Sequence, residues 1–155
     1  MRKFKLYLDT SVISHLFAED TLEKMADTNN FWQELKQGKF DISISVTTLG
    51  EIDECDEPKR SKMLSKLNEV EHEVLTSTKE VEHLAREYVK NNILSEKHFD
   101  DCTHIAYAVI NGCDIIVSWN FRHLVNHKTI NGVKIVNAIN NYKEISIMSP
   151  SMLSY

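Results

Sequence analysis

Four oxygen-bearing side chains, spread along the chain, have the types and positions expected of a cation site. They are three acids and one amide: Asp9, Glu51, Asp101 and Asn120. Carboxylates gathered in one place repel one another and lose hydration, at a cost of several kcal/mol per buried ion unless a cation lies among them. Because every donor is an oxygen, the hard cations Mg²⁺ and Mn²⁺ are favoured. Either ion suits hydrolysis of a phosphodiester, since it activates water and neutralises charge on phosphorus.

Three short apolar runs place most of these residues. The runs, with the polar residues that close them, are Phe4 to Leu8 with Asp9-Thr10-Ser11, Phe40 to Val46 with Thr47-Thr48, and Ile115 to Val117 with Ser118-Trp119-Asn120. Runs of this length, rich in Ile and Val, are typical of buried strands in a largely parallel sheet. Two later runs, 133–136 and 145–148, predict edge strands.

The segments between the runs predict helices. Thr48 and Glu51 have the spacing of a capping box, which also offers Glu51 a purely structural role. Ser95 is expected to cap a helix that continues to about Asn111, with Gly112 as its stop. Further helix starts are predicted at Asp20, Pro58 and Ser77. The alternation of strands and helices predicts a three-layer α/β/α sandwich with a mainly parallel central sheet.

The predicted topology brings the acids together. In an open parallel sheet, ligands bind at the carboxyl ends of the strands. Asp9 closes the first strand, and Glu51 lies one helical turn beyond the second. Asp101 occupies the first turns of a later helix, offset correctly from its inner stripe, whereas the neighbouring Asp100 is the less favoured candidate. We therefore expect Asp9, Glu51 and Asp101 at one edge of the sheet.

The length of the chain limits the number of domains, and its net charge limits how it could bind nucleic acid. The chain has 155 residues, with 18 Lys and Arg against 23 Asp and Glu, and a net charge of −5. A chain of this length can bury roughly 70% of the surface that it exposes when unfolded, so residues 1–155 predict a single domain. The acidic balance provides no overall attraction to phosphate. Any nucleic acid must therefore be held by a local basic patch or by bound cations.

Cysteine usage and the first apolar run bear on location. Cys55, Cys102 and Cys113 are widely spaced and form no CxxC motif, which argues against a disulfide framework or a zinc knuckle. The first apolar run is interrupted at Asp9, far short of a signal peptide or a membrane span. We expect a cytoplasmic protein without membrane association.

Five segments, in order, resemble the motifs of the PIN-domain family. They are Leu6-Tyr7-Leu8-Asp9-Thr10-Ser11-Val12-Ile13, Thr47-Thr48-Leu49-Gly50-Glu51, Asp101-Cys102-Thr103-His104-Ile105-Ala106, Ile116-Val117-Ser118-Trp119-Asn120-Phe121-Arg122-His123-Leu124, and Ile147-Met148-Ser149-Pro150. The resemblance covers nearly the whole chain. It implies a PIN-like fold and a metal-dependent ribonuclease directed at single-stranded RNA, most often the toxin of a VapC-type toxin–antitoxin pair. A cognate antitoxin and a homodimer are the partners it implies.

Motif matching assigns roles to the individual residues. Asp9, Glu51 and Asp101 take the acidic positions that bind Mg²⁺ or Mn²⁺. Asn120 stands where many relatives carry a fourth Asp, so it brings an oxygen without a charge. The resulting hypothesis has these four residues as the catalytic set, with Asn120 orienting a bound water that attacks an RNA phosphodiester. The candidate substrate-binding residues are Thr10, Ser11 and Arg122.

Several neighbouring residues have two interpretations. His104 either contacts substrate or, as favoured, makes a structural hydrogen bond. Trp119 either stacks on a base or anchors its segment in a half-buried position. Arg122, His123 and Lys128 form either a cationic rim for phosphates or a solvated loop.

Two rival functions belong to other classes. The amide at Asn120 and the negative net charge favour a PIN-like module that binds RNA or a protein without cutting. A phosphatase-like hydrolase with Asp9 as nucleophile ranks last, because the partner acid expected two residues later is Ser11.

Overall fold

Five short parallel strands form one sheet in the order β3-β2-β1-β4-β5. The computed structural model describes residues 2–153, and within them no helix has both the length and the apolar character needed to cross a membrane. The elements in chain order are β1 (Lys5–Leu8), α1 (Thr10–His15), α2 (Leu22–Lys36), β2 (Asp41–Ser45), α3 (Val46–Asp53), α4 (Lys59–Leu67), β3 (Glu73–Leu75), α5 (Lys79–Lys90), the 3₁₀ turn η1 (Glu96–His98), α6 (Phe99–Ile110), β4 (Ile115–Val117), α7 (His127–Ile139), β5 (Ser146–Met148) and α8 (Pro150–Leu153).

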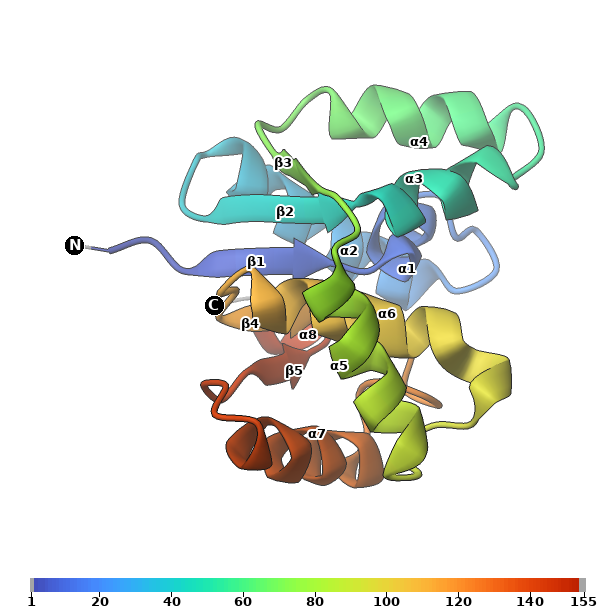
Figure 1. The fold of residues 1–155 in the computed structure, drawn as a ribbon. Coiled ribbons are helices and arrows are strands. Elements are labelled where there is room, and N and C mark those ends of the chain that lie inside the picture. The colour runs from blue at the N-terminus through green and yellow to red at the C-terminus, as the bar shows by residue number, and fades with distance from the viewer. Residues whose placement is uncertain (1, 154–155) are drawn as a thin grey trace.

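Helices cover both faces of the sheet. Successive side chains of a strand point to opposite faces, so Leu6 and Leu8 enter one core cluster while Tyr7 enters the other. The cluster around Tyr7 takes in α5, α6 and α7, and the opposite cluster takes in α1, α2 and α4. Figure 1 shows α4 near the β3 edge and α7 near the β5 edge. The predicted α/β/α sandwich is confirmed.

Strand β1 lies in the middle of the sheet, between β2 and β4. Its end is joined to the end of β4, because the backbone N–H of Asp9 donates to the carbonyl oxygen of Val117 over 3.0 Å. The arrowheads of β1 and β2 point the same way, toward α1 and α3 (Figure 1). The carboxyl ends of these strands therefore meet at one edge.

Four of the predicted helix starts are wrong in detail. Helices α2 and α5 have Thr21 and Thr78 as N-caps, each one residue after the expected Asp20 and Ser77. Helix α3 begins earlier than expected, because Ser45 and Thr48 form the capping box: the Thr48 N–H donates to Ser45 Oγ over 3.4 Å, and the Ser45 N–H donates to Thr48 Oγ1 over 3.3 Å. Glu51 takes no part in this cap. The helix expected after Ser95 begins only at Phe99, after the η1 turn, and the Ser95 side chain makes no capping bond.

The prediction of a strand at 133–136 is also wrong. These residues lie inside α7, whose start is fixed by Asn126 Oδ1 accepting from the Thr129 N–H over 2.9 Å. Val133 and Val136 are buried, whereas Ile135 between them is 60% exposed. This spacing fits a helix face and does not fit alternation along a strand. The strand predicted at 145–148 is present as β5, and β3 was not predicted.

Candidate functional site at the carboxyl end of the sheet

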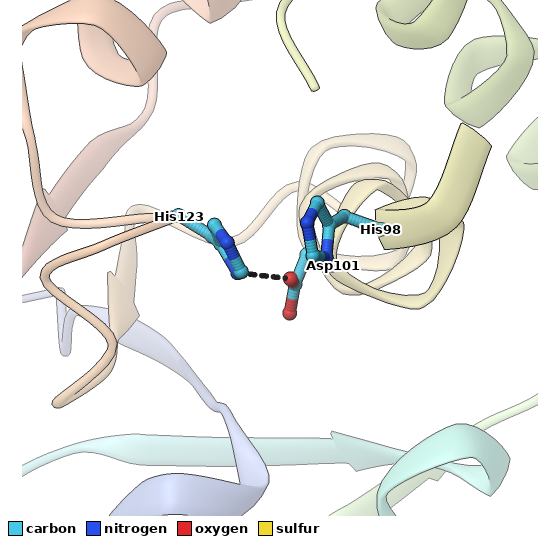
Figure 2. A group of neighbouring side chains, drawn as sticks. All are labelled: His98, Asp101 and His123. Atoms are coloured by element: carbon cyan, nitrogen blue, oxygen red, sulfur yellow. Dashed lines mark ion pairs between the residues drawn. The ribbon is translucent and has the colours of Figure 1, made fainter. Parts of the chain in front are cut away.

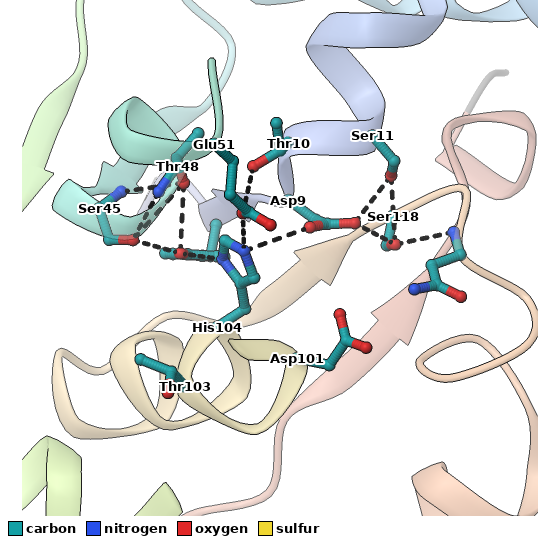
Figure 3. Close-up of polar contacts among 12 residues, drawn as sticks. Asp9, Thr10, Ser11, Ser45, Thr48, Glu51, Asp101, Thr103, His104 and Ser118 are labelled. Carbon is teal, nitrogen blue, oxygen red and sulfur yellow. Dashed lines mark hydrogen bonds and ion pairs between the residues drawn. The ribbon is translucent and has the colours of Figure 1, made fainter. Parts of the chain in front are cut away.

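Asp9 is the buried carboxylate at the end of β1. Its side chain is fixed by two hydroxyls, since Oδ2 accepts from Ser118 Oγ over 2.7 Å and from Ser11 Oγ over 2.8 Å. Ser118 directly follows β4, so the Asp9 carboxylate bridges two adjacent strand ends (Figure 3). The residue is only 5% exposed. Its second oxygen, Oδ1, lies 3.6 Å from Nε2 of His104.

Glu51 reaches the same place from α3. Its Oε1 accepts from Thr10 Oγ1 over 2.7 Å and lies 2.5 Å from His104 Nε2. Burial opposes ionisation of Glu51, but the bonds from His104 and Thr10 outweigh burial and lower its pKa. Glu51 is therefore a carboxylate at neutral pH. Its side chain is 34% exposed, so this side of the site is open to solvent.

His104 connects the acids to the core. It is completely buried on α6, and its Nδ1 lies 2.6 Å from the Tyr7 hydroxyl, which in turn lies 2.8 Å from Ser45 Oγ. Burial lowers the pKa of His104, but its contacts with Tyr7, Glu51 and Asp9 outweigh burial and raise that pKa well above the ordinary value. When protonated, the imidazole donates from Nδ1 to the Tyr7 hydroxyl and from Nε2 to Glu51 Oε1. The favoured structural interpretation of His104 is thus the one that the geometry bears out.

Asp101 projects from the first turn of α6 toward Asp9 and Ser118 (Figure 3). Burial and the nearby Asp9 carboxylate raise the pKa of Asp101, and the histidines 104 and 123 offset this only in part. Its Oδ2 lies 3.1 Å from Nδ1 of His123. Asp101 therefore faces excess negative charge on one side and an imidazole on the other.

The structure divides the predicted cation ligands between two groups. In one, donor atoms of Asp9, Glu51 and His104 lie within 4.8 Å of one another. In the other, Asp101 stands within the same limit of His98 and His123. Among the described residues, Asp9, Glu51 and Asp101 do not form one such group by themselves. Asp101 is nevertheless close enough for Asp9 and Glu51 to raise its pKa.

The remaining predicted residues are held in different ways. Asn120 Oδ1 accepts from the His123 N–H over 2.9 Å and so shapes the loop after β4. Ser11 Oγ accepts from the Trp119 N–H over 2.9 Å, in addition to its bond with Asp9. Trp119 is 6% exposed and donates from Nε1 to Thr28 Oγ1 over 2.7 Å, which fits the anchor interpretation. Arg122 is exposed, and within residues 2–153 its guanidinium has no ion pair.

Two contributions to the site were not predicted from the sequence. Ser118 was recognised only as a residue that follows a strand, yet it is fully buried and holds Asp9. His104 was not expected to join Asp9 and Glu51. A hydroxyl directly after a buried strand, and a histidine one turn after a helix acid, were the available sequence features.

The donor set fits a hard divalent cation. Asp9 and Glu51 share one imidazole, Asp101 adds a third acidic group close enough for both to raise its pKa, and the open donors of Asp9 and Glu51 are oxygens. Oxygen ligands of this kind suit Mg²⁺ or Mn²⁺. The site therefore contains acidic groups capable of holding a metal.

Comparison with solved structures identifies the fold. The Mycobacterium tuberculosis toxin VapC20, described as cleaving the sarcin–ricin loop, has a TM-score of 0.59 and 17% identity over 76% of this chain and 92% of its own. VapBC2 from Rickettsia felis, bound to a DNA fragment from the promoter of the pair, has a TM-score of 0.60 and 13% identity over 94% of this chain and 98% of its own. The chain has a PIN-domain fold. No protein-family model and no curated protein matches the sequence.

The PIN fold agrees with the motif order found in the sequence. In this PIN-domain fold, Asp9 directly follows β1, and Glu51 lies on α3 after β2. Asp101 lies on α6 before β4, and Asn120 lies on the loop after β4. At identities of 13% and 17%, the likeness concerns the fold. Which reaction the site supports depends on its side chains and not on the fold.

Proposed function

We propose that this protein is a Mg²⁺- or Mn²⁺-dependent endoribonuclease that cuts single-stranded RNA, and that it is the toxin of a toxin–antitoxin pair. The observation that carries the proposal is that donor atoms of Asp9 and Glu51 lie within 4.8 Å of each other at the carboxyl end of a PIN-fold sheet, with Asp101 near enough for both to raise its pKa. VapC20, which has the same fold, is described as a toxin that cleaves an RNA loop. That likeness supports the same class of reaction here.

Each residue of the proposed site has a task that its contacts support. Asp9 and Glu51, together with Asp101, would hold the cation, and Ser118 fixes the Asp9 carboxylate in place. When bound, a divalent cation activates water and neutralises charge that develops on the phosphate. His104 donates to Glu51 and keeps that carboxylate ionised and oriented.

The loop after β4 would meet the RNA. Asn120 uses its Oδ1 to hold the loop through the His123 N–H, so its amide nitrogen is the group left to orient water or substrate. Thr10 donates to Glu51, and Ser11 to Asp9, so both hydroxyls position ligands in addition to any contact with RNA. The exposed Arg122 is the proposed phosphate contact.

The test is cleavage of a labelled single-stranded RNA by the purified protein in Mg²⁺ or Mn²⁺, with EDTA as the metal-free arm. We expect Asp9→Asn to slow cleavage by about 10²–10³-fold, the scale on which loss of one charge-stabilising group acts. Asp100→Asn is the matched control, because Asp100 is exposed and adjacent in sequence to Asp101. Cleavage that survives EDTA or Asp9→Asn undiminished contradicts the proposal.

A second candidate is a PIN-fold module that binds RNA or protein without cutting. It is favoured by Asn120, which adds no charge at the fourth position, and by His104, which already supplies one positive charge to Asp9 and Glu51. In this case wild-type protein shows no tight Mn²⁺ site by calorimetry. Gain of both Mn²⁺ binding and cleavage by Asn120→Asp would then favour this second candidate over the first.

The toxin role implies a small antitoxin that covers the site, and the VapBC2 complex supports such a partner. Production of the protein alone should arrest growth of a host cell, and co-production with the product of an adjacent small reading frame should relieve it. Asp9→Asn should abolish the arrest.

A homodimer is the oligomeric state proposed, and sedimentation velocity of the purified chain tests it.

A further inference from the structure

A second cluster of donor atoms adjoins the acidic site through Asp101. It comprises His98 at the end of η1, Asp101 in the first turn of α6 and His123 in the loop after β4 (Figure 2). One donor atom from each lies within 4.8 Å of the other two. The centroids of the two imidazole rings are 3.8 Å apart, and Asp101 Oδ2 lies 3.1 Å from His123 Nδ1.

The imidazole nitrogens of this cluster have few protein partners. Among residues 2–153, neither ring nitrogen of His98 has a hydrogen bond, and Nε2 of His123 has none. All three residues are half-buried, so water does not freely surround them. The neutral imidazole is the form that binds metals.

We propose that His98, Asp101 and His123 form a binding site for a zinc-class transition metal ion. Two imidazoles and one carboxylate are a ligand set that zinc uses when a further position stays open to solvent. The two sites share Asp101, but nitrogen donors distinguish this one from that of Asp9 and Glu51, whose open donors are oxygens. Mg²⁺ prefers oxygen ligands and is not expected here. The proposal goes beyond the nuclease function and does not require it.

An ion bound by all three residues needs a rearrangement at His98. Zn–N and Zn–O bonds of about 2.0–2.1 Å place tetrahedral ligand atoms about 3.3 Å apart. Asp101 Oδ2 and His123 Nδ1 are already 3.1 Å apart. The remaining approach is that of His98, which lies at the end of a three-residue turn. Its donor atom lies within 4.8 Å of those of Asp101 and His123, so His98 must approach them while its ring leaves the 3.8 Å stack with His123.

The competing interpretation is a structural clamp in which the His98 and His123 rings stack and tie the loop after β4 to α6. Both interpretations predict some loss of stability when either histidine is removed. Only the metal site predicts a specific loss of metal affinity. The measurement is therefore titration of metal-free, untagged full-length protein with Zn²⁺ by calorimetry, and with Co²⁺ by visible absorption.

We expect one Zn²⁺ site per chain. His98→Ala and His123→Ala should each lower the Zn²⁺ affinity by at least about 10–100-fold. Loss of a residue that only supports a metal ligand already lowers affinity by that factor. His83→Ala is the matched control, because His83 is an exposed histidine on α5. Asp9→Asn should leave Zn²⁺ binding in place, which distinguishes this site from the acidic one. Circular dichroism and thermal unfolding verify that each variant is folded.

The proposal is overturned if Zn²⁺ does not bind, or if both histidine variants bind it as tightly as wild type. It is also overturned if Asp9→Asn abolishes binding while His98→Ala retains it. Should a variant fail to fold, NMR of wild-type protein decides: Co²⁺ must broaden the imidazole signals of His98 and His123 before that of His104. If zinc binds and RNA is not cleaved, the nuclease proposal is contradicted and the zinc site stands. If RNA is cleaved and zinc does not bind, the nuclease proposal stands and the zinc site is contradicted.

Discussion

Nε2 of His104 lies 2.5 Å from Oε1 of Glu51 and 3.6 Å from Oδ1 of Asp9, so one buried imidazole on α6 serves two carboxylates from other parts of the fold. The same ring lies 2.6 Å from the Tyr7 hydroxyl on its other side. One buried side chain therefore joins the site to the core.

Removal of His104 should destabilise the protein strongly. In His104→Ala the carboxylates of Asp9 and Glu51 lose their buried counter-charge, and the Tyr7 hydroxyl loses a partner. Breaking a buried ion pair costs about 3–5 kcal/mol. Urea unfolding of the variant measures the loss, with His83→Ala as the control for an exposed histidine. A difference from wild type no larger than that of the control would show that the buried contact contributes nothing.

Ser118 should matter to Asp9 although no motif role was expected of it. The hydroxyl of Ser118 is fully buried, donates to Asp9 Oδ2 and accepts from the Asn120 N–H over 2.9 Å. Ser118→Ala should lower the unfolding free energy by about 1.5–3 kcal/mol, the usual contribution of a hydrogen bond to a charged group. Chemical denaturation provides the value. Ser65→Ala, on the exposed face of α4, should change it little.

Asp114 should make stability depend on pH at the other end of the sheet. Its carboxylate accepts from the Lys5 N–H over 2.8 Å and pairs with Arg2 and Lys143. Burial opposes ionisation, but the Lys5 N–H, Lys143 and Arg2 outweigh burial and lower the pKa of Asp114.

Because the pKa of Asp114 is lower in the folded state, its contribution is present above the unfolded value of about 3.9 and disappears as pH falls through the folded value. Asp114→Asn should therefore cost about 1 kcal/mol at pH 7, as expected for a solvent-screened ion pair, and progressively less as pH falls below the unfolded value. Thermal unfolding across this range is the measurement. An equal cost at both pH values would mean that the carboxylate charge is irrelevant.

Tyr88 should contribute through its hydroxyl. It is fully buried on α5 and donates to Asn137 Oδ1 on α7 over 2.6 Å. In Tyr88→Phe the buried Asn137 keeps no side-chain partner among the described residues, since its Nδ2 already lacks one. We expect a loss of about 1–3 kcal/mol in unfolding free energy. Tyr142→Phe, which removes the hydroxyl that donates to Glu80 at the surface, is the comparison and should be nearly neutral.

Much of the fold could be predicted because its strands carry local patterns. The strands near residues 5, 42 and 116 were recognised as apolar runs closed by polar residues, and parallel pairing then placed their ends together. The sequence does not predict β3, because this strand has only three residues, of which Glu73 and Val74 are exposed. The segment 133–136 was assigned to a strand because a short apolar run does not reveal its period.

The sequence by itself determined the layered fold and most of its strands and helices, and it indicated Asp9, Glu51 and Asp101 as the candidate acids, because these depend on local periodicity and on where strands end. Only the tertiary structure decided that Glu51 pairs with His104, that Ser118 holds Asp9, and that Asp101 stands beside two imidazoles. Those contacts join residues from separate elements. Their partners are selected by sheet order and by the packing of α6, which no short stretch of sequence encodes.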